Sequence, residues 1–462
     1  MKLLGWILLL GATAVAQPLS PPIKLEATSV LGDVVRFGRP FLAQIKVTVN
    51  DPSLNQECRL QLQSISNELM SSEVPLRLTL GTRSFTMPLV SGNYNTEASV
   101  EGIARSLQSR ETISSMTMAP DTDYVALTLT PRKNHFAYLG GYKALLQQGE
   151  FRLNYPKSLN LLPETWWVYL GQDAIVVHDL PALKLNDSIE QAVLQWTQSG
   201  GTLVLVSNLD PQEYRDTAFE SWLPLKPGGL SSGQVPKVIG HSSPQNVVLT
   251  HEGYPLVLRR RCGNGWVYQV TTPVTTQEAL GNALTSKLWK AIVSDETGLM
   301  LRRQVFEGDG RLSILPELPP PATAALAWYL AVYVLVAVPG AYAYLRRKDQ
   351  VLRLILVIPA LSLVFSGGAY YFNTAGRGKE LVMRELGLAK LVSGQRVALN
   401  DQTSVLFSPA GGQFSIAVPA ESLVRPASEY RAQERQHTML CRGNDYSIEN
   451  ERLAQFGVSR WR

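Results

Sequence analysis

Two long stretches without a charged side chain dominate the hydropathy pattern, and they lie close together in the second half of the chain. Residues 322–345 contain 24 residues without a formal charge, and residues 354–375 form a second uncharged run. At about 1.5 Å rise per helical residue, each run is long enough to cross a hydrocarbon core of about 30 Å. Because lipid offers no partners to backbone groups, the two runs should form a hairpin of transmembrane helices.

The short connection between the two runs predicts how the hairpin is oriented. Residues 346–353 carry four basic side chains, Arg346, Arg347, Lys348 and Arg353. Short loops rich in Lys and Arg stay in the cytoplasm, so this turn should be cytoplasmic. The chain before and after the hairpin should then lie on the exoplasmic, or periplasmic, side of a plasma (inner) membrane.

The N-terminus predicts how the chain reaches that side. Lys2 precedes an apolar core, and Ala14-Val15-Ala16 has the small-residue pattern of a signal-peptidase site. Residues 1–16 are therefore predicted to be a signal peptide, with a short N-terminal membrane anchor as the alternative. Either interpretation exports the body of the chain and gives a multi-pass membrane protein with two spans in the hairpin.

Residues 17–132 show short runs in which apolar and polar positions alternate. Residues 41–49, 58–62 and 124–129 are examples, and turn signals such as Asn50-Asp51-Pro52 separate the runs. Alternation with a period of two and a turn every ten or so residues is typical of an antiparallel β-sandwich. No catalytic constellation occurs here, so an interaction or spacer domain is predicted.

Residues 133–310 change to the pattern of an α/β domain. The apolar run at residues 173–179 is followed by a segment with helical spacing, a Gly200-Gly201 stop and a second apolar run at residues 202–206. Strand, helix and strand in this order predict a βαβ unit in a parallel sheet that is covered on both faces. Asn186 or Asp187 suits the N-cap of the helix.

Three further elements are expected in the same domain. Residues 135–149 have apolar side chains on one helix face, and residues 279–293 have a stripe of apolar residues spaced four apart. Residues 254–270 read as two strands around a Gly-Asn-Gly turn, which predicts a hairpin. A Pro-rich linker, residues 311–321, then leads to the first span.

Polar side chains follow the two predicted parallel strands, where open α/β sheets bind their ligands. His178 and Asp179 come at the end of the first strand, and Ser207, Asn208 and Asp210 follow the second. Two interpretations are open. The residues either form a polar pocket for a small molecule or sugar, or they satisfy backbone groups of their own loops.

The predicted hairpin carries three consecutive basic residues, Arg259, Arg260 and Arg261. They either form a patch for an anionic partner or belong to a solvated strand edge. The net charge of the whole chain is small, because 43 Lys and Arg against 38 Asp and Glu give a formal charge of only +5. Such a balance favours anionic lipid or wall polymers and is too weak to indicate nucleic acid.

Cysteine and histidine usage gives no sign of a cofactor or a metal. Cys58, Cys262 and Cys441 are too few and too scattered for a disulfide framework, so they form one bridge or remain free buried thiols. The histidines are isolated, with no His-x-x-His or His-Glu pair that suggests a metal site. We therefore predict neither a metal nor a cofactor.

The tail, residues 376–462, is predicted to be a small β-rich region on the exoplasmic side. Residues 395–399, 403–409 and 413–419 read as strands. A region of this size with few bulky apolar groups would be marginally stable alone. We therefore expect the tail to dock on the N-terminal body or on another subunit.

Residues 173–179, the helix that ends at residues 195–201, and residues 202–206 together resemble the class I glutamine-amidotransferase-like (flavodoxin-like) fold. More specifically, they resemble its degenerate members in bacterial envelope proteins. In that group a β-sandwich precedes the domain, and a glycine hairpin and a Tyr-rich double span follow it. The resemblance covers most of the chain in order. It implies a multidomain α/β and β protein: an N-terminal β-sandwich, an α/β domain, a transmembrane hairpin and a C-terminal β-rich region.

The chain departs from this family where an enzyme would need its nucleophile. An amidotransferase requires a cysteine on a tight strand-to-helix elbow, with a histidine and a carboxylate to activate it. None of the three cysteines occupies such an elbow, and Ser207-Asn208 lacks the flanking glycines. Amidotransferase activity is therefore not expected, and most proteins of this group have no characterised activity.

We predict a non-enzymatic, membrane-anchored envelope protein whose exoplasmic domains bind a partner protein or a wall polymer. A carbohydrate or small-ligand binder that uses the pocket at the strand ends is one alternative, and a hydrolase with an unrecognised site is another. A transporter is disfavoured, because two apolar spans without an ionisable residue offer a substrate no path.

Overall fold

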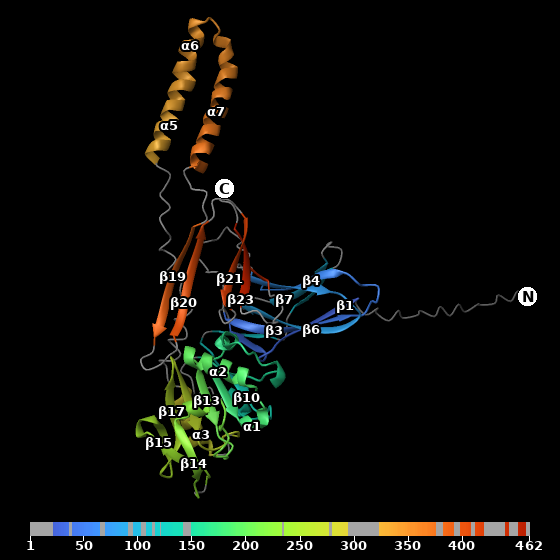
Figure 1. Ribbon diagram of the computed structural model, residues 1–462, viewed down its shortest axis with the longest axis vertical. Helices are drawn as coiled ribbons and strands as arrows, with labels where there is room; N and C mark the ends of the chain where they lie inside the picture. Colours follow the sequence, from blue (N-terminus) through green and yellow to red (C-terminus); the bar gives the residue numbers. More distant parts are fainter. Residues whose placement is uncertain are drawn as a thin grey trace, which may run out of the picture.

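The structure is a computed structural model (Figure 1). It describes residues 22–36, 39–64, 70–90, 96–102, 108–112, 116–120, 122–141, 149–232, 235–276, 280–293, 323–375, 382–391, 398–407, 412–419, 439–442 and 451–458. The predicted signal peptide, residues 1–16, and the predicted linker, residues 311–321, lie outside these residues.

The N-terminal region contains two antiparallel sheets that pack face to face. The smaller sheet has the order β1-β3-β6, and the larger contains β5-β4-β7-β8. Alternating apolar side chains from both sheets, such as Ile45, Leu60 and Leu62, form a shared buried core. These strands are β1 (Ile23–Ser29), β3 (Pro40–Val49), β4 (Glu57–Ser64), β5 (Met70–Arg77), β6 (Gly81–Val90), β7 (Thr96–Gly102) and β8 (Gln108–Thr112). The period-two pattern thus gives the predicted sandwich.

C-terminal strands extend the larger sheet, giving the order β21-β23-β22-β5-β4-β7-β8. β22 pairs in parallel with β5, with Met439 opposite Met70. An open sheet edge carries unpaired N–H and C=O groups, and β22 covers such an edge on β5. Of the two docking partners expected for the tail, the N-terminal body and another subunit, the structure shows the N-terminal body. The added strands are β21 (Gly412–Pro419), β22 (Met439–Arg442) and β23 (Glu451–Val458).

The first part of the tail forms a separate two-stranded antiparallel ribbon of β19 (Val382–Leu391) and β20 (Ala398–Phe407). The strands predicted at residues 395–399 and 403–409 are thus one strand. Asn400 and Asp401, which lie between the two predicted strands, are inside the ladder opposite Ala389 and Leu388.

The central domain is built on a seven-stranded sheet with the order β11-β10-β12-β13-β18-β17-β16. The first five strands of this order are mutually parallel, and β17 and β16 add antiparallel. Numbered along the chain, the parallel strands run 2-1-3-4-5, an order of doubly wound sheets. The strands are β10 (Tyr124–Leu129), β11 (Phe151–Asn154), β12 (Ala174–His178), β13 (Thr202–Val206), β16 (Val247–His251), β17 (Tyr254–Cys262) and β18 (Gly265–Val270).

One strand of this sheet corrects the sequence prediction. Residues 124–129 were assigned to the sandwich, within residues 17–132, but β10 pairs in parallel with β11 and β12. All six of its residues are buried, so its apparent alternation does not mark a solvent face. Thr128 supplies the polar position, and its hydroxyl donates to the carbonyl oxygen of Asn154 at 2.9 Å.

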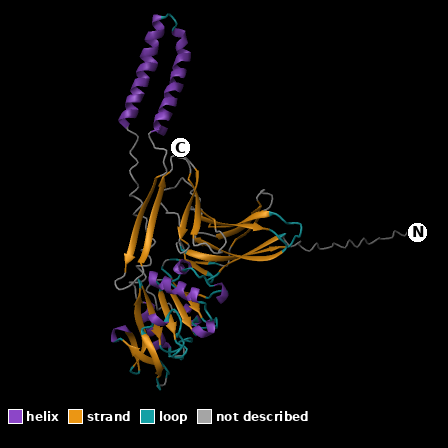
Figure 2. Cartoon of the chain, viewed as in Figure 1, coloured by secondary structure: helices purple, strands orange, loops and turns teal. Residues whose placement is uncertain are grey.

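Helices cover both faces of the sheet (Figure 2). α2 (Asp187–Ser199) packs on one face with the 3-10 helix η4 (Trp166–Gly171), and α3 (Asn282–Val293) packs on the other with η1 (Ala137–Gly141). The βαβ unit is as predicted, and Asn186 is its N-cap, accepting from the Ile189 N–H at 2.7 Å. A Cβ on Gly201 would lie 2.6 Å from the Trp196 ring, which explains the glycine stop.

The helix predicted at residues 135–149 is only the 3-10 turn η1 in the part that the structure describes. The helix predicted at residues 279–293 begins at Asn282. The remaining elements are short: β2 (Val34–Arg36), β9 (Thr117–Ala119), α1 (Leu180–Leu183), β14 (Leu225–Leu230), β15 (Val238–Ser242), η3 (Leu159–Leu161), η5 (Glu220–Trp222) and η6 (Pro244–Asn246).

Two apolar helical segments form an antiparallel pair (Figure 1). Residues 327–347 and 351–371 are each long and apolar enough to cross a membrane. Their apolar side chains are largely exposed, for example Ile355 at 74% and Leu363 at 75%, which a core helix of a water-soluble domain would not show. Tyr329 donates across the pair to the Phe365 carbonyl oxygen at 2.8 Å.

The first of these segments is not one continuous α-helix. It consists of α5 (Thr323–Leu335), a π-helical turn at Val336–Gly340 and α6 (Ala341–Arg347), whereas α7 (Leu354–Ala375) has the predicted bounds. Pro339 lies in the π turn, where its missing N–H removes a helical hydrogen bond.

The four basic residues of the predicted turn lie mainly in the helices that flank it. Arg346 and Arg347 belong to the last turn of α6, and Lys348 is its C-cap. Arg353 lies in the 3-10 helix η11 (Val351–Arg353), just before α7. The cations of Arg346 and Lys348 lie over the rings of Tyr342 and Tyr344.

A buried ion pair joins the sandwich region to the parallel sheet. Arg36 of β2 donates to both carboxylate oxygens of Asp173, at 2.8 and 2.5 Å, and to the Asp123 carbonyl oxygen at 2.6 Å. Asp173 also accepts from the Val125 N–H at 2.9 Å. Asp123 and Asp173 precede β10 and β12, so the sandwich region contacts the amino ends of these strands.

A side-chain amide makes a second connection at this interface. Asn154, at the end of β11, accepts from the Val34 N–H at 2.9 Å and donates to the Val34 carbonyl oxygen at 2.7 Å. This pair of bonds imitates one rung of a β ladder. A Cβ on Gly32 would lie 2.6 Å from the Asn154 amide oxygen, so only glycine fits beside this contact.

Replacing Arg36 with methionine should destabilise the protein strongly. The change leaves the buried Asp173 carboxylate without its charge partner, which typically costs about 3–5 kcal/mol. Lys24→Met is the control, because Lys24 pairs with Glu26 on the surface, where the loss should be at most about 1 kcal/mol. Urea unfolding of the detergent-solubilised chain, followed by tryptophan fluorescence, measures both. Equal losses would contradict the structural role of the buried pair.

Candidate functional site

The fold brings the predicted residues together at the carboxyl ends of β12 and β13. His178 ends β12 and Asp179 follows it, while Ser207 and Asn208 follow β13. The Asn208 amide donates to the Asp179 carboxylate at 3.0 Å, which ties the two strand ends to each other. Asp210 accepts from the Gln212 N–H at 2.9 Å within its own loop.

A residue that the sequence analysis did not select, Glu213, completes this cluster. It is 2% exposed, and its carboxylate accepts from the Asn208 N–H at 2.9 Å and from the Leu180 N–H at 3.3 Å. Burial raises the pKa of Glu213 to about 7, although these backbone N–H groups oppose the shift. Only the folding back of its loop onto the strand ends identifies it, so no local sequence signal marks this residue.

Backbone strain is concentrated at the same edge of the sheet. Asp179 has a φ of 57° and Leu209 a φ of 72°, and Phe136, in the loop after β10, has a φ of 65°. Residues with a Cβ rarely adopt this left-handed conformation, and such residues cluster at functional sites. Three strand connections are therefore held in costly conformations at one edge.

Two histidines also meet at this edge. The ring centroids of His135 and His178 are 5.4 Å apart, although the sequence separates them by a strand, a crossover and a second strand. His178 shares a hydrogen bond with the Val206 carbonyl oxygen, and His135 shares one with the Thr130 hydroxyl. Burial lowers the pKa of both rings, which favours their neutral forms.

Neither the serine at this edge nor the described thiols elsewhere in the chain are activated. The buried Ser207 hydroxyl accepts from the Leu209 N–H at 3.0 Å. Cys58 and Cys262 are free, buried thiols, and burial raises the pKa of Cys262 to about 12 and raises that of Cys58 as well. Thiols with raised pKa values are poor nucleophiles at neutral pH. Across the described residues there is no group of three or more His, Cys, Asp or Glu side chains placed to hold a metal ion.

The arginine triplet does not form a single patch. β17 pairs with β18 in the predicted hairpin, and alternation places Arg259 and Arg261 on one face and Arg260 on the other. The guanidinium groups of Arg259 and Arg261 lie over the Trp266 ring, at 4.7 and 5.2 Å from its centroid. Arg260 lies over Trp222 at 5.7 Å and donates to the Ser221 carbonyl oxygen at 2.7 Å.

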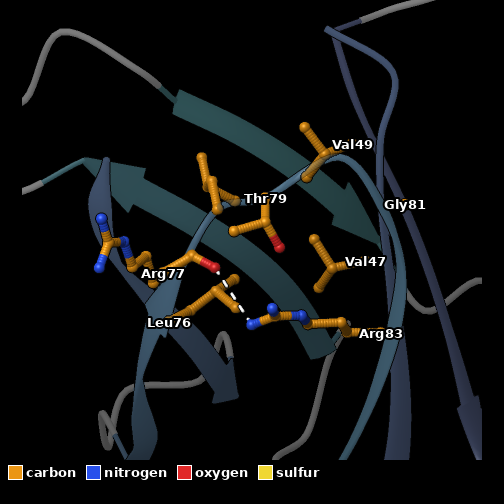
Figure 3. A pocket seen from close by; sticks show the side chains of 8 residues that line it. Val47, Val49, Leu76, Arg77, Thr79, Gly81 and Arg83 are labelled. Atoms are coloured by element: carbon orange, nitrogen blue, oxygen red, sulfur yellow. Dashed lines mark hydrogen bonds between the residues drawn. The ribbon is translucent and has the colours of Figure 1, made fainter. Parts of the chain in front are cut away.

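The sandwich has a shallow indentation at one end, beside the turn at Gly81 (Figure 3). Its empty volume is about 170 Å³ and includes open solvent. Binding sites for small molecules usually enclose about 300–1,000 Å³. Arg83 crosses the indentation and donates to the Arg77 carbonyl oxygen at 3.3 Å, so this feature is no ligand site.

Comparisons with known proteins do not assign the chain to a family. No family model matches it, and no curated protein matches it. Among solved structures it is similar to a β-glucosidase from Listeria innocua in complex with gluconolactone, at 10% identity and a TM-score of 0.15, over 20% of this chain and 15% of that one. The same enzyme with isofagomine gives 12% identity, a TM-score of 0.15 and 21% and 16% coverage. Similarities of this extent assign neither a fold nor a function.

Glu213 should make the stability of the protein fall as the pH rises. Its pKa is about 7 in the folded state against an ordinary value of 4.5, so folding favours the protonated form. The resulting stabilisation is complete below pH 4.5 and is lost as the pH rises through 7, by roughly 3 kcal/mol at most. The thermal midpoint of Glu213→Gln should therefore change less than that of the wild type between pH 5 and 8. Exposed Glu220→Gln is the control, and parallel curves for wild type and Glu213→Gln would refute the assignment.

Proposed function

We propose that this chain is a non-enzymatic, membrane-anchored protein of the bacterial cell envelope. In this proposal its sandwich and α/β domain act as a scaffold or binding module for a partner protein or a wall polymer. The observation that carries the proposal is the buried connection through Arg36 and Asp173, because a scaffold needs domains in a fixed relation. The two apolar helices supply the anchor.

The arrangement of the α/β domain supports a degenerate class I glutamine-amidotransferase-like module. Its parallel strands have the flavodoxin-like order 2-1-3-4-5. The strand ends where such enzymes place their chemistry carry Ser207 and Asn208, and both bond to neighbouring loop groups. A domain that keeps this architecture without an activated nucleophile is suited to binding.

The orientation in the membrane belongs to the same proposal. The basic residues Arg346, Arg347, Lys348 and Arg353 cluster at one end of the helix pair, which favours a cytoplasmic turn. The sandwich, the α/β domain and the tail then share the exoplasmic side. The pairing of β22 with β5 supports this arrangement, because paired strands must lie on the same side of the membrane.

The stacked arginines of β17 are the groups that best fit an anionic partner, and alternation places Arg260 and Arg261 on opposite faces of the strand. Arg260 and Arg261 are exposed, and among the described residues neither forms an ion pair. Their stacking on Trp222 and Trp266 fixes the guanidinium planes, which can then bind carboxylates with two parallel hydrogen bonds. Arginine and tryptophan are also the residues that contribute most to protein interfaces.

Replacing both arginines should remove the partner while leaving the fold intact. In intact cells, crosslinking followed by mass spectrometry should recover a partner with the wild type and at least about tenfold less with Arg260→Gln/Arg261→Gln, given losses of about 1.4 kcal/mol or more. Lys226→Gln, at another exposed basic residue, should have no effect. Recovery of no partner with the wild type would contradict the scaffold, and unchanged recovery with the double variant would contradict a role for these two arginines.

The strained strand ends favour a second candidate, a carbohydrate or small-ligand binder at the cluster of Asp179 and Asn208. Asp179→Ala/Asn208→Ala should then abolish binding of wall-derived carbohydrate fragments in calorimetry without changing the thermal midpoint. If the pair only fixes its loops, the midpoint should fall instead, because the free energy of unfolding drops by the roughly 0.5–1.5 kcal/mol of one hydrogen bond. Asp216→Ala, at an exposed loop position, is the control.

A further inference from the structure

We propose that His135 and His178 form a binding site for a late first-row divalent metal ion of the Zn²⁺ type. The inference is independent of the proposed scaffold function. It starts from the 5.4 Å distance between the two ring centroids. The two residues are 43 positions apart in the chain (178 minus 135), so local sequence motifs do not reveal the pair.

The pair lies where a doubly wound sheet usually binds its ligand. His135 lies in the connection after β10, and His178 is the last residue of β12, which is the neighbour of β10 in the sheet. From β10 the chain moves to β11 on one side and then returns to β12 on the other. The crevice outside the carboxyl ends of strands at such a switch point is the general ligand position of these sheets.

The hydrogen bonds of His178 orient its ring. A carbonyl oxygen only accepts, so the 3.2 Å contact with Val206 makes Nδ1 the protonated nitrogen and leaves a lone pair on Nε2. Val206 belongs to β13, on the far side of β12 from β10. The opposite edge of the ring therefore faces the side of His135. His178 is 7% exposed, and Nε2 has no hydrogen-bond partner among the residues described.

His135 has the matching arrangement. Its Nδ1 lies 2.8 Å from the Thr130 hydroxyl oxygen, and its Nε2 also has no hydrogen-bond partner in the described parts of the chain. Each ring is thus held through a hydrogen bond at Nδ1, and its Nε2 is available to coordinate a metal ion. Histidines that bind metals have this arrangement, because the bond to the second nitrogen sets the tautomer and the ring orientation.

The spacing of the two rings fits a shared ion. With Zn–N distances of about 2.0–2.1 Å and a tetrahedral angle, two imidazoles bound through Nε2 place their centroids about 5 Å apart. The observed distance is 5.4 Å, and the ring planes are inclined by 59°. Simple aromatic packing explains the contact of His178 with Phe136, at 6.1 Å. It leaves the Nε2 atoms of both histidines without a hydrogen-bond partner among the described residues.

The remaining ligands would come from solvent or from a bound molecule. No third His, Cys, Asp or Glu among the described residues is placed to complete the site. Two neighbouring charges have opposite effects, because the Asp179 carboxylate attracts a cation and the Arg132 guanidinium repels it. The site would therefore be open, with two protein ligands and coordination positions free for exchange.

Metal titration of the detergent-solubilised full chain, purified without a polyhistidine tag, tests the site. Calorimetry with Zn²⁺ and the visible spectrum with Co²⁺ should show one ion per chain. His135→Gln and His178→Gln should each weaken binding at least tenfold, and His241→Gln, at an exposed histidine elsewhere in the domain, should not. Absence of binding by the wild type at micromolar Zn²⁺, or wild-type affinity in both glutamine variants, would overturn the proposal.

A variant that keeps both imidazoles shows whether weaker Zn²⁺ binding comes from lost coordination or from a loss of folding. Thr130→Val removes the hydroxyl that fixes His135 and should weaken Zn²⁺ binding by about tenfold, as for other outer-shell partners. Its thermal midpoint without metal is compared with that of the wild type. If His178→Gln lowers the thermal midpoint without metal, its Zn²⁺ affinity is set aside. The Zn²⁺ affinities of His135→Gln and Thr130→Val then test coordination. Wild-type affinity in both of those variants would refute coordination by this pair.

Discussion

The buried pair of Arg36 and Asp173 is the interaction on which the arrangement of the sandwich region and the α/β domain depends. Two charges out of water are tolerated only where their hydrogen bonds are well made, and here Asp173 accepts from a guanidinium and from the Val125 N–H. Because Asp173 precedes β12, the contact fixes the amino ends of the sheet against the sandwich. It leaves the opposite edge, with its histidines and strained loops, available to a ligand.

That opposite edge combines two kinds of polar group. Asp179, Asn208 and Glu213 bond to one another or to loop backbone, and so they stabilise the connections between strands. The two histidines differ from them, since each has one nitrogen fixed and the other without a partner in the described chain. Self-satisfied groups usually have structural roles, whereas an imidazole nitrogen without a partner remains available to a ligand. The histidines are therefore the most informative residues of this edge.

Sequence patterns predicted the elements whose signals are local. The helix capped by Asn186, the strands beside it, the glycine hairpin and α7 all depend on spacing within some 20 residues, and all form as expected. β10 was misassigned because a strand buried on both faces can still contain a polar Thr128 that bonds to the neighbouring strand. The roles of Glu213 and of the histidine pair depend on crossovers, so only the fold reveals them.

The parallel pairing of β22 with β5 has a consequence for the order in which the protein assembles. The partners Met439 and Met70 are 369 residues apart (439 minus 70), and both apolar helices lie between them. A ribosome completes β5 long before β22 exists, so this edge of β5 stays uncovered until both apolar helices and the tail have been synthesised. Contacts this distant in sequence form slowly. During biogenesis the last strands thus act as a completion step, and a chain stalled between helices would present an adhesive sheet edge to its surroundings.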